Sequence, residues 1–91
     1  MDFGEALRAL KEGKKISRNK WNEDEIFLWM KEGAMVKAEW CHDSMLKKIA
    51  EENDGVIEAL PCICIKTADN KIVSGWCPSQ EDMFSEDWII I

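Results

Sequence analysis

The spacing of apolar residues predicts a helix at the beginning of the chain. Apolar side chains recur at intervals of three and four residues, the period of one helix face, at Phe3, Ala6, Leu7 and Leu10. Gly13 follows them, and glycine readily adopts the positive φ that ends many helices. We therefore expect a first helix over residues 3–12.

Short apolar runs separated by turn residues predict strands in the rest of the chain. The expected strands cover residues 14–18, 26–30, 35–40, 62–66, 71–75 and 88–91. We expect 26–30 and 35–40 to pair as a hairpin, and 62–66 to pair with 71–75. The last strand is apolar on both faces, so we expect it in the centre of the sheet or covered by another subunit.

Capping residues predict two further helices. Either Asp43 or Ser44 is expected to cap a helix in the middle of the chain. Ser79 stands three residues before Asp82, as in a capping box, and predicts a short helix over 80–84. The chain is therefore expected to form a single domain over residues 1–91 of the α+β class. Its sheet should be small and antiparallel-dominated, with an N-terminal helix and one or two further short helices.

The chain is short for its aromatic content. Its 91 residues include five Trp and no Tyr, and a chain of this length buries only about two thirds of its unfolded surface. Association with other subunits would supply further burial, because aromatic side chains are favoured where protein surfaces meet. The apolar runs are far shorter than the roughly 20 residues of a membrane-spanning helix.

The start of the chain and its cysteines predict a reducing compartment. Residues 1–5 lead directly into the amphipathic pattern, so we expect no signal peptide. The four cysteines are therefore expected to be free thiols, and the protein is expected to be cytoplasmic.

The charge of the chain is unevenly distributed. The net charge is −6, but residues 8–20 carry six cations against one acid, a local charge of +5 that leaves −11 for the remainder. An acidic protein is a poor binder of nucleic acid polymers, whose affinity rests on a broad basic surface. A local basic patch fits a small anionic ligand better. Alternatively, it is a solvated helix face that runs into a basic turn.

The segment Arg18-Asn19-Lys20-Trp21-Asn22 has the chemistry of a nucleotide site. An indole face stacks on a base, Arg and Lys contact phosphate, and an Asn side chain both donates and accepts hydrogen bonds. The alternative is a surface turn beside a half-buried Trp. A second polar group occurs near the carboxyl end, where a hairpin turn and a helix entry offer free backbone N–H groups to an anion. Its residues are Thr67, Asp69, Ser79 and Gln80. Turn chemistry and capping explain these residues equally simply.

Catalytic and metal-binding patterns are weak. His42 directly follows Cys41, and neighbours on an extended strand point to opposite faces, so a Cys–His nucleophile pair is not expected. Cys62 and Cys64 lack the two-residue gap of most zinc sites, and alternation on a strand favours core thiols over a zinc-stapled module. The chain has no Gly-rich phosphate loop. We therefore expect no enzyme activity, no metal site and no cofactor.

The motifs of the whole chain resemble those of one family. The N-terminal motifs are Phe3-Gly4-Glu5-Ala6-Leu7, Leu10-Lys11-Glu12-Gly13, Arg18-x-x-Trp21-Asn22 and Phe27. The C-terminal motifs are Ile65-Lys66-Thr67-Ala68-Asp69, Trp76-x-Pro78-Ser79-Gln80-x-Asp82-Met83 and Asp87-Trp88. Their order and spacing resemble the Thoeris anti-defence 2 family from end to end.

This resemblance implies a phage-encoded sponge that acts in the host bacterial cytoplasm. Such a protein binds and sequesters the cyclic ADP-ribose isomer (glycocyclic ADP-ribose) made by a Toll/interleukin-receptor domain enzyme, without cleaving it. Some family members also hold cyclic dinucleotides of the related CBASS signalling. The family further implies a homotetramer, a dimer of dimers, with ligand pockets between subunits.

The same resemblance assigns candidate ligand-binding residues. Trp21 would stack on the adenine, with Arg18 and Asn22 at phosphate, ribose or base edges. Trp76 would form a wall of the pocket or part of the core. The polar partners would be Thr67, Asp69, Ser79, Gln80 and Asp82. Asp87 and Trp88 also match the pattern, but we interpret them as structural.

Two features depart from the family pattern. Lys20 stands where many relatives have Gly, and the acidic run 23–25 follows Asn22, so the identity of the ligand is open. Residues 37–60 match no motif and are candidates for a second pocket or a subunit contact. A protein-binding inhibitor, whose acidic surface docks directly on a host defence protein, is the alternative function.

Overall fold

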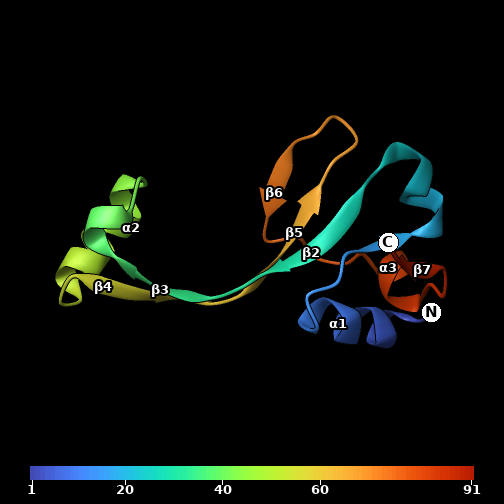
Figure 1. Ribbon diagram of the computed structural model, residues 1–91, viewed down its shortest axis with the longest axis horizontal. Helices are drawn as coiled ribbons and strands as arrows, with labels where there is room; N and C mark the ends of the chain where they lie inside the picture. The colour runs from blue at the N-terminus through green and yellow to red at the C-terminus, as the bar shows by residue number, and fades with distance from the viewer. The chain divides into compact units, whose positions relative to one another are not determined.

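The computed structural model describes residues 1–91, except the side chain of Asn22. The chain forms two compact units: residues 1–31 together with 62–91, and residues 32–61. In chain order the elements are α1 (Phe3–Lys11), β1 (Ile16–Arg18), η1 (Asn19–Asp24), β2 (Phe27–Lys31), β3 (Ala34–Lys37), η2 (Ala38–Trp40), α2 (Ser44–Glu52), β4 (Val56–Ala59), β5 (Cys62–Lys66), β6 (Ile72–Ser74), α3 (Gln80–Phe84) and β7 (Trp88–Ile90) (Figure 1).

Helix α1 begins at a capping box and ends beside a glycine. The Asp2 carboxylate accepts a hydrogen bond from the Glu5 N–H at 2.8 Å, and the Glu5 carboxylate accepts one from the Asp2 N–H at 3.1 Å. Each bond satisfies a backbone donor at the helix start. Gly13 follows the helix with a φ of 84°, a conformation that glycine adopts without steric cost. The predicted first helix is confirmed within one residue at its end.

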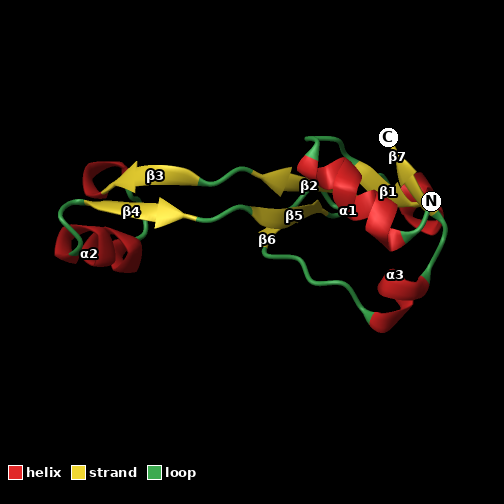
Figure 2. Ribbon diagram, turned by 90° about the horizontal axis from the view of Figure 1, so that it is seen from below, coloured by secondary structure: helices red, strands yellow, loops and turns green.

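The first unit is built on a five-stranded antiparallel sheet with the order β6-β5-β2-β1-β7. Leu28 of β2 lies opposite Ile16 of β1 on one side and Ile65 of β5 on the other. Helix α1 packs against β1, β2 and β7 (Figure 2). The buried core consists of Ala6, Ala9, Leu10, Ile16, Leu28 and Trp88. The predicted α+β class with an antiparallel sheet is confirmed.

Helix α3 is short and begins at a capping box. The Ser79 hydroxyl accepts a hydrogen bond from the Asp82 N–H at 3.1 Å, while the Asp82 carboxylate accepts one from the Ser79 N–H at 2.8 Å. The Trp88 indole N–H donates to the Asp82 carbonyl at 2.9 Å. The predicted capping box and the helix over 80–84 are confirmed, and the helix is tied to the core through Trp88.

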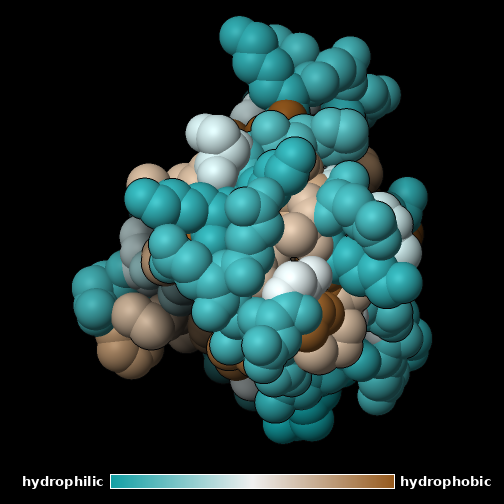
Figure 3. Space-filling model, turned by 90° about the vertical axis from the view of Figure 1, so that its left-hand side faces the viewer, coloured by the Kyte–Doolittle hydropathy of each residue, from teal (hydrophilic) through white to brown (hydrophobic). Residues whose placement is uncertain are grey.

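The second unit contains a two-stranded antiparallel sheet, β3 with β4, together with η2 and α2. The Asp43 carboxylate caps α2 by accepting a hydrogen bond from the Leu46 N–H at 2.9 Å, so Asp43 and not Ser44 is the cap of the predicted helix. Ala50 is the only buried hydrophobic residue among the described residues of this unit. Figure 3 shows a view of the surface in which hydrophobic atoms (brown) reach solvent between hydrophilic ones (teal).

Two sequence predictions about strands are wrong. β2 does not form a hairpin with β3: it pairs with β1 and β5, and β3 pairs with β4, a strand that the apolar pattern did not predict. β2 carries apolar side chains on both faces, which suits a central strand. The run 35–40 also ends as a strand at Lys37 and continues as a 3-10 helix.

The last strand, β7, lies at the edge of the sheet and not in its centre. It pairs only with β1, whose other side is taken by β2. Trp88 is buried, but Ile90 and Ile91 keep 49% and 45% of their surface exposed. That another subunit covers this end stays a prediction, as does the single domain over residues 1–91. Among the described residues, none of the helices has the length and apolar character that crossing a membrane requires.

Candidate functional site

Three tryptophans form a compact aromatic cluster in the first unit. The ring centroids of Trp21 and Trp88 lie 5.4 Å apart, those of Trp76 and Trp88 6.2 Å, and those of Trp21 and Trp76 6.4 Å. All three pairs are close to perpendicular, which is a favoured arrangement of aromatic rings. Trp88 is buried, whereas Trp21 and Trp76 are only partly buried. Trp21 and Trp76 therefore expose part of their indole surface to solvent while they pack against the buried Trp88.

Arg18 lies against this cluster and has partners for its whole guanidinium group. Its Nε donates to Asp87 at 2.9 Å, and one terminal nitrogen donates to Asp82 at 3.0 Å and to Glu81 at 3.3 Å. The other terminal nitrogen donates to the Ser85 hydroxyl at 2.6 Å. The Arg18 carbon Cζ also lies 5.9 Å from the Trp21 ring and 5.9 Å from the Trp88 ring. Arg18 is 4% exposed. It joins β1 and the tryptophans to α3.

The charges of this network stabilise one another. Burial alone would lower the pKa of Arg18, but its hydrogen bonds to Asp87 and Asp82 outweigh burial and raise that pKa. Burial would raise the pKa of Asp82, yet hydrogen bonds from Ser79 and from Arg18 lower it. The pKa of Asp87 is lowered in the same way, because Arg18 outweighs the effect of burial. At neutral pH all three groups are charged.

Lys20 also joins the network. Its ammonium group forms an ion pair with Glu81, which is shared with Arg18. Lys20 first and Arg18 second lower the pKa of Glu81. This ion pair links η1 to α3.

The described residues of this site suit binding better than catalysis. The carboxylates of Glu81, Asp82 and Asp87 are each engaged by Arg18. A carboxylate held ionised by a buried cation is a poor proton donor or acceptor near neutral pH. What remains available is the partly exposed surface of Trp21 and Trp76, which can stack on a flat ring.

The structure brings together some of the predicted site residues and separates others. The tryptophan cluster contains Trp21 and Trp76, and the hydrogen-bond network beside it contains Arg18 and Asp82. The exposed start of α3 contains Ser79 and Gln80. The predicted role of Asn22 concerns a side chain outside the described residues.

Thr67 and Asp69 lie instead at the tip of the β5–β6 hairpin. The Thr67 hydroxyl donates to the Asp69 carboxylate at 2.5 Å and accepts from the Lys71 N–H at 3.0 Å. Asp69 also forms an ion pair with Lys71 at 3.1 Å. Thr67 first and Lys71 second lower the pKa of Asp69. These bonds are the turn chemistry that the sequence analysis gave as the alternative interpretation of these two residues.

Sequence reasoning missed Glu81 and Ser85, both of which contact the Arg18 guanidinium. One signal was present. The segment 81–87 contains four acids, whereas residues 8–20 are strongly basic, so a pairing between the two segments was available from charge alone. The choice of Arg18 among six cations depends on its buried position in β1 and has no local signal.

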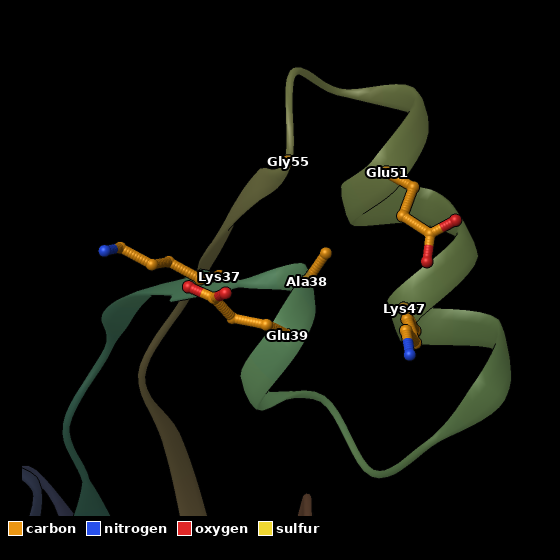
Figure 4. A pocket seen from close by; sticks show the side chains of 6 residues that line it. All are labelled: Lys37, Ala38, Glu39, Lys47, Glu51 and Gly55. Carbon is orange, nitrogen blue, oxygen red and sulfur yellow. The ribbon is translucent and has the colours of Figure 1, made fainter.

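A separate open pocket of about 380 Å³ lies within the second unit. Figure 4 shows its lining: Lys47 and Glu51 project from α2, and Lys37, Ala38 and Glu39 come from the end of β3 and from η2, with Gly55 beside them. Two cations and two anions line it and no aromatic ring does, so it offers a nucleotide neither stacking nor a net positive charge. It lies within residues 37–60, which we expected to form a second pocket or a subunit contact, and a ligand-binding role for it stays a prediction.

The described side chains contain no group of three or more His, Cys, Asp or Glu that could hold a metal ion. All four cysteines are free thiols, and Cys64 is buried. His42 and Cys41 follow η2 and lie outside any strand. The predicted zinc-stapled alternative therefore has no set of ligands among the described residues.

Comparison with known proteins gives two matches over this chain. The sequence model of a Thoeris anti-defense 2-like domain matches residues 1–91. A relative named Thoeris anti-defense 2, from Bacillus phage SP01, is 41% identical over 91 residues, which cover 100% of this chain and 94% of that protein.

Proposed function

This chain belongs to the Thoeris anti-defense 2-like family, and from that premise we propose that it is a non-catalytic sponge for a nucleotide immune signal. Family membership supports a phage anti-defence role. In the proposed mechanism the protein binds a cyclic ADP-ribose isomer such as glycocyclic ADP-ribose in the host cytoplasm and does not cleave it. The effector of the defence system then stays inactive. Cyclic dinucleotides are the second ligand class to test.

One structural observation carries the ligand part of this proposal. Trp21 is partly exposed at the margin of a cluster whose other members fix its ring from two sides. A ring that is already immobile loses little conformational entropy when a base stacks on it, so the contact favours tight binding. A sponge requires this tight binding, because the signal that it removes acts at low concentration.

The contacts in the structure change the roles that we propose for two of the candidate binding residues, Arg18 and Asp82. The guanidinium of Arg18 is nearly enclosed and bonded to four side chains, so we assign to it the positioning of Trp21 and α3, and not a phosphate contact. Asp82 has the same structural role. Ligand contacts are proposed for Trp21, Asn22, Trp76, Ser79 and Gln80. Thr67 and Asp69 would reach the ligand from a neighbouring subunit.

The second unit supports assembly into the proposed homotetramer. Below about 40 residues a chain segment seldom buries enough surface to be stable alone, and this unit has 30 residues, 32–61. Large apolar side chains remain exposed on it: Met35 58%, Trp40 57%, Met45 61%, Leu46 46%, Ile49 41% and Leu60 75%. Covering them with further copies of the chain would provide the missing burial and place ligand pockets between subunits.

A capture experiment tests the sponge. The purified protein is mixed with a panel of cyclic ADP-ribose isomers and cyclic dinucleotides, and the loss of each from an ultrafiltrate is measured. We expect depletion of one ligand class and release of the intact molecule on heating. Trp21→Ala should abolish capture with an unchanged circular dichroism spectrum and oligomeric state, and Trp21→Phe should retain part of it. Trp29→Ala is the matched control, because Trp29 alternates with the core-facing Leu28 and lies on the other face of the sheet.

Two other outcomes would replace this proposal. Release of a cleaved nucleotide would make the protein an enzyme. If no nucleotide is depleted and the protein instead forms a stable complex with a host defence protein in a pull-down, the acidic protein-binding inhibitor is the function.

A further inference from the structure

A pair of thiols lies on strand β5, on the sheet face away from the main core. Cys62 and Cys64 alternate with Ile63 and Ile65, which pack against that core. The two cysteine sulfurs are 4.0 Å apart. Both cysteines are free thiols, Cys64 is 1% exposed and Cys62 is partly exposed, so the pair is largely sheltered yet has one member at the surface.

Neighbouring strands complete the surroundings of this pair. Cys64 lies opposite Trp29 of β2 and opposite Ser74 of β6. The Ser74 hydroxyl oxygen is 3.6 Å from the Cys64 sulfur. Two sulfur atoms and one oxygen atom thus gather on one face of three paired strands.

A direct disulfide does not suit these positions well. Residues two apart on a strand have Cα atoms separated by roughly 6.7 Å, which is at the upper end of the range that disulfides link and longer than their usual separation of about 5.5–6 Å. Closing the bond would draw the sulfurs from 4.0 Å to about 2.05 Å and would bend β5. A single ion between the sulfurs needs no such contraction.

The sulfur separation fits an ion with a low coordination number. With metal–sulfur bonds of the zinc–thiolate length, about 2.3 Å, sulfurs 4.0 Å apart subtend an angle of roughly 120° at the ion. That angle is close to trigonal and lies between the tetrahedral and linear values, so the number of donors decides which ion fits. Structural zinc takes four strong ligands, and no third His, Cys, Asp or Glu joins this pair among the described side chains. Soft thiolate ligands favour Cu(I).

We propose that Cys62 and Cys64 form a two-thiolate site for one soft monovalent ion, Cu(I). Each thiol loses its proton on binding, and both sulfurs then bond to the ion with no change of oxidation state. The ion links the surface-exposed Cys62 to the buried Cys64. This site is separate from the tryptophan cluster, so a test of Cu(I) binding and a test of nucleotide capture have independent outcomes.

A competition titration tests the site. The reduced full-length protein is titrated anaerobically with Cu(I) in the presence of bicinchoninate, a coloured Cu(I) chelator. We expect the protein to withhold one Cu(I) per chain from the chelator. Loss of a residue that only supports a metal ligand weakens metal binding by roughly 10–100-fold. Cys62→Ser removes a ligand itself, so it should weaken Cu(I) binding by at least as much. Cys64→Ala should do the same, and Cys77→Ser, which changes an exposed thiol, is the matched control and should bind as the parent does.

Three results would overturn the proposal. The first is a protein that withholds no Cu(I) from the chelator, and the second is a Cys62→Ser variant with unchanged affinity. The third is Zn²⁺ bound as tightly as Cu(I) in a parallel titration with a zinc chelator. Circular dichroism checks each variant. If the buried Cys64→Ala change unfolds the protein, the partly exposed Cys62→Ser change decides the question alone.

Discussion

The two units of this chain differ in how they bury apolar surface. In the first unit, α1 and the five-stranded sheet enclose Leu10, Ile16, Leu28 and Trp88, each less than 2% exposed. In the second unit only Ala50 is buried among the described hydrophobic residues, while Trp40 and Leu60 keep 57% and 75% of their surface exposed. The first unit has a core of its own. The second has the surface composition of an interface.

This difference separates two kinds of stability. Contacts inside the first unit stabilise each chain, whatever the protein concentration. Contacts made by the second unit with other copies would stabilise the fold only through mass action, so their contribution would rise with protein concentration. Substitutions in the two units should therefore differ in kind as well as in size.

The largest effect is expected from Trp88→Ala. Trp88 is 1% exposed, its ring packs against Phe3 at 5.5 Å, and its indole N–H is bonded to the Asp82 carbonyl. Removing a buried Trp costs about 3–5 kcal/mol of unfolding free energy, measured by urea denaturation followed by circular dichroism. Trp40→Ala is the control from the second unit, and its effect should vanish at low protein concentration. If Trp88→Ala and Trp40→Ala lowered the unfolding free energy equally at every protein concentration, the division into two kinds of stability would be wrong.

Arg18→Met should have the next largest effect. The variant keeps the length of the side chain but leaves the Asp82 carboxylate, whose side chain is 12% exposed, without its buried counter-charge. Breaking a buried pair from one side costs about 3 kcal/mol or more, again measured by urea denaturation. Lys20→Met is the matched control: its partner Glu81 is exposed, so the loss should be small. Adding Asp82→Leu to Arg18→Met should restore part of the stability, because the unpaired charge is then gone.

The local elements could be predicted from sequence because their signals lie within a few residues. The capping residues Asp43 and Ser79 and the 62–66/71–75 hairpin all have partners close in the chain, and the structure confirms them. The pairing of β2 could not be predicted, because its partner β5 lies beyond an entire second unit. The turn-like residues between β2 and β3 instead suggested the nearer partner, which is wrong.

The candidate site shows the same limit. Trp21 was proposed from its own chemistry, since an indole next to cations is visible in the sequence. The partners of Arg18 were not, because Asp87 lies 69 residues away and Glu81 lies 63 residues away. An Arg among polar neighbours looks equally suited to phosphate and to a carboxylate of the same chain. Only the tertiary structure distinguishes the two.

A double change on α2, Leu46→Ser with Ile49→Ser, should weaken assembly more than folding. Both side chains are exposed on the helix, at 46% and 41%, and they are not part of the core cluster of the first unit. Loss of an interface anchor costs about 1–2 kcal/mol of association free energy, seen in sedimentation velocity as dissociation at a higher protein concentration. Lys48→Ser on the same helix is the control and should assemble as the parent does. A parent protein that sediments as a monomer would remove the role given to the second unit.

The smallest effect is expected from acid, and it should arise in the first unit. The pKa values of Asp82 and Asp87 are lowered in the folded protein. Burial would raise both, but hydrogen bonds from Ser79 and then from Arg18 lower the pKa of Asp82, and Arg18 lowers that of Asp87. A carboxylate with a lowered folded pKa contributes stability that is fully present above its unfolded pKa, about 3.9, and is lost as the pH falls through the folded value. Unfolding free energy should thus be flat from pH 7 to about pH 5 and decrease below about pH 4. Asp82→Asn should be less stable at neutral pH but lose less on acidification, as measured by urea midpoints at each pH. A variant with the same acid dependence as the parent would show that the loss of stability comes from carboxylates outside the Arg18 network.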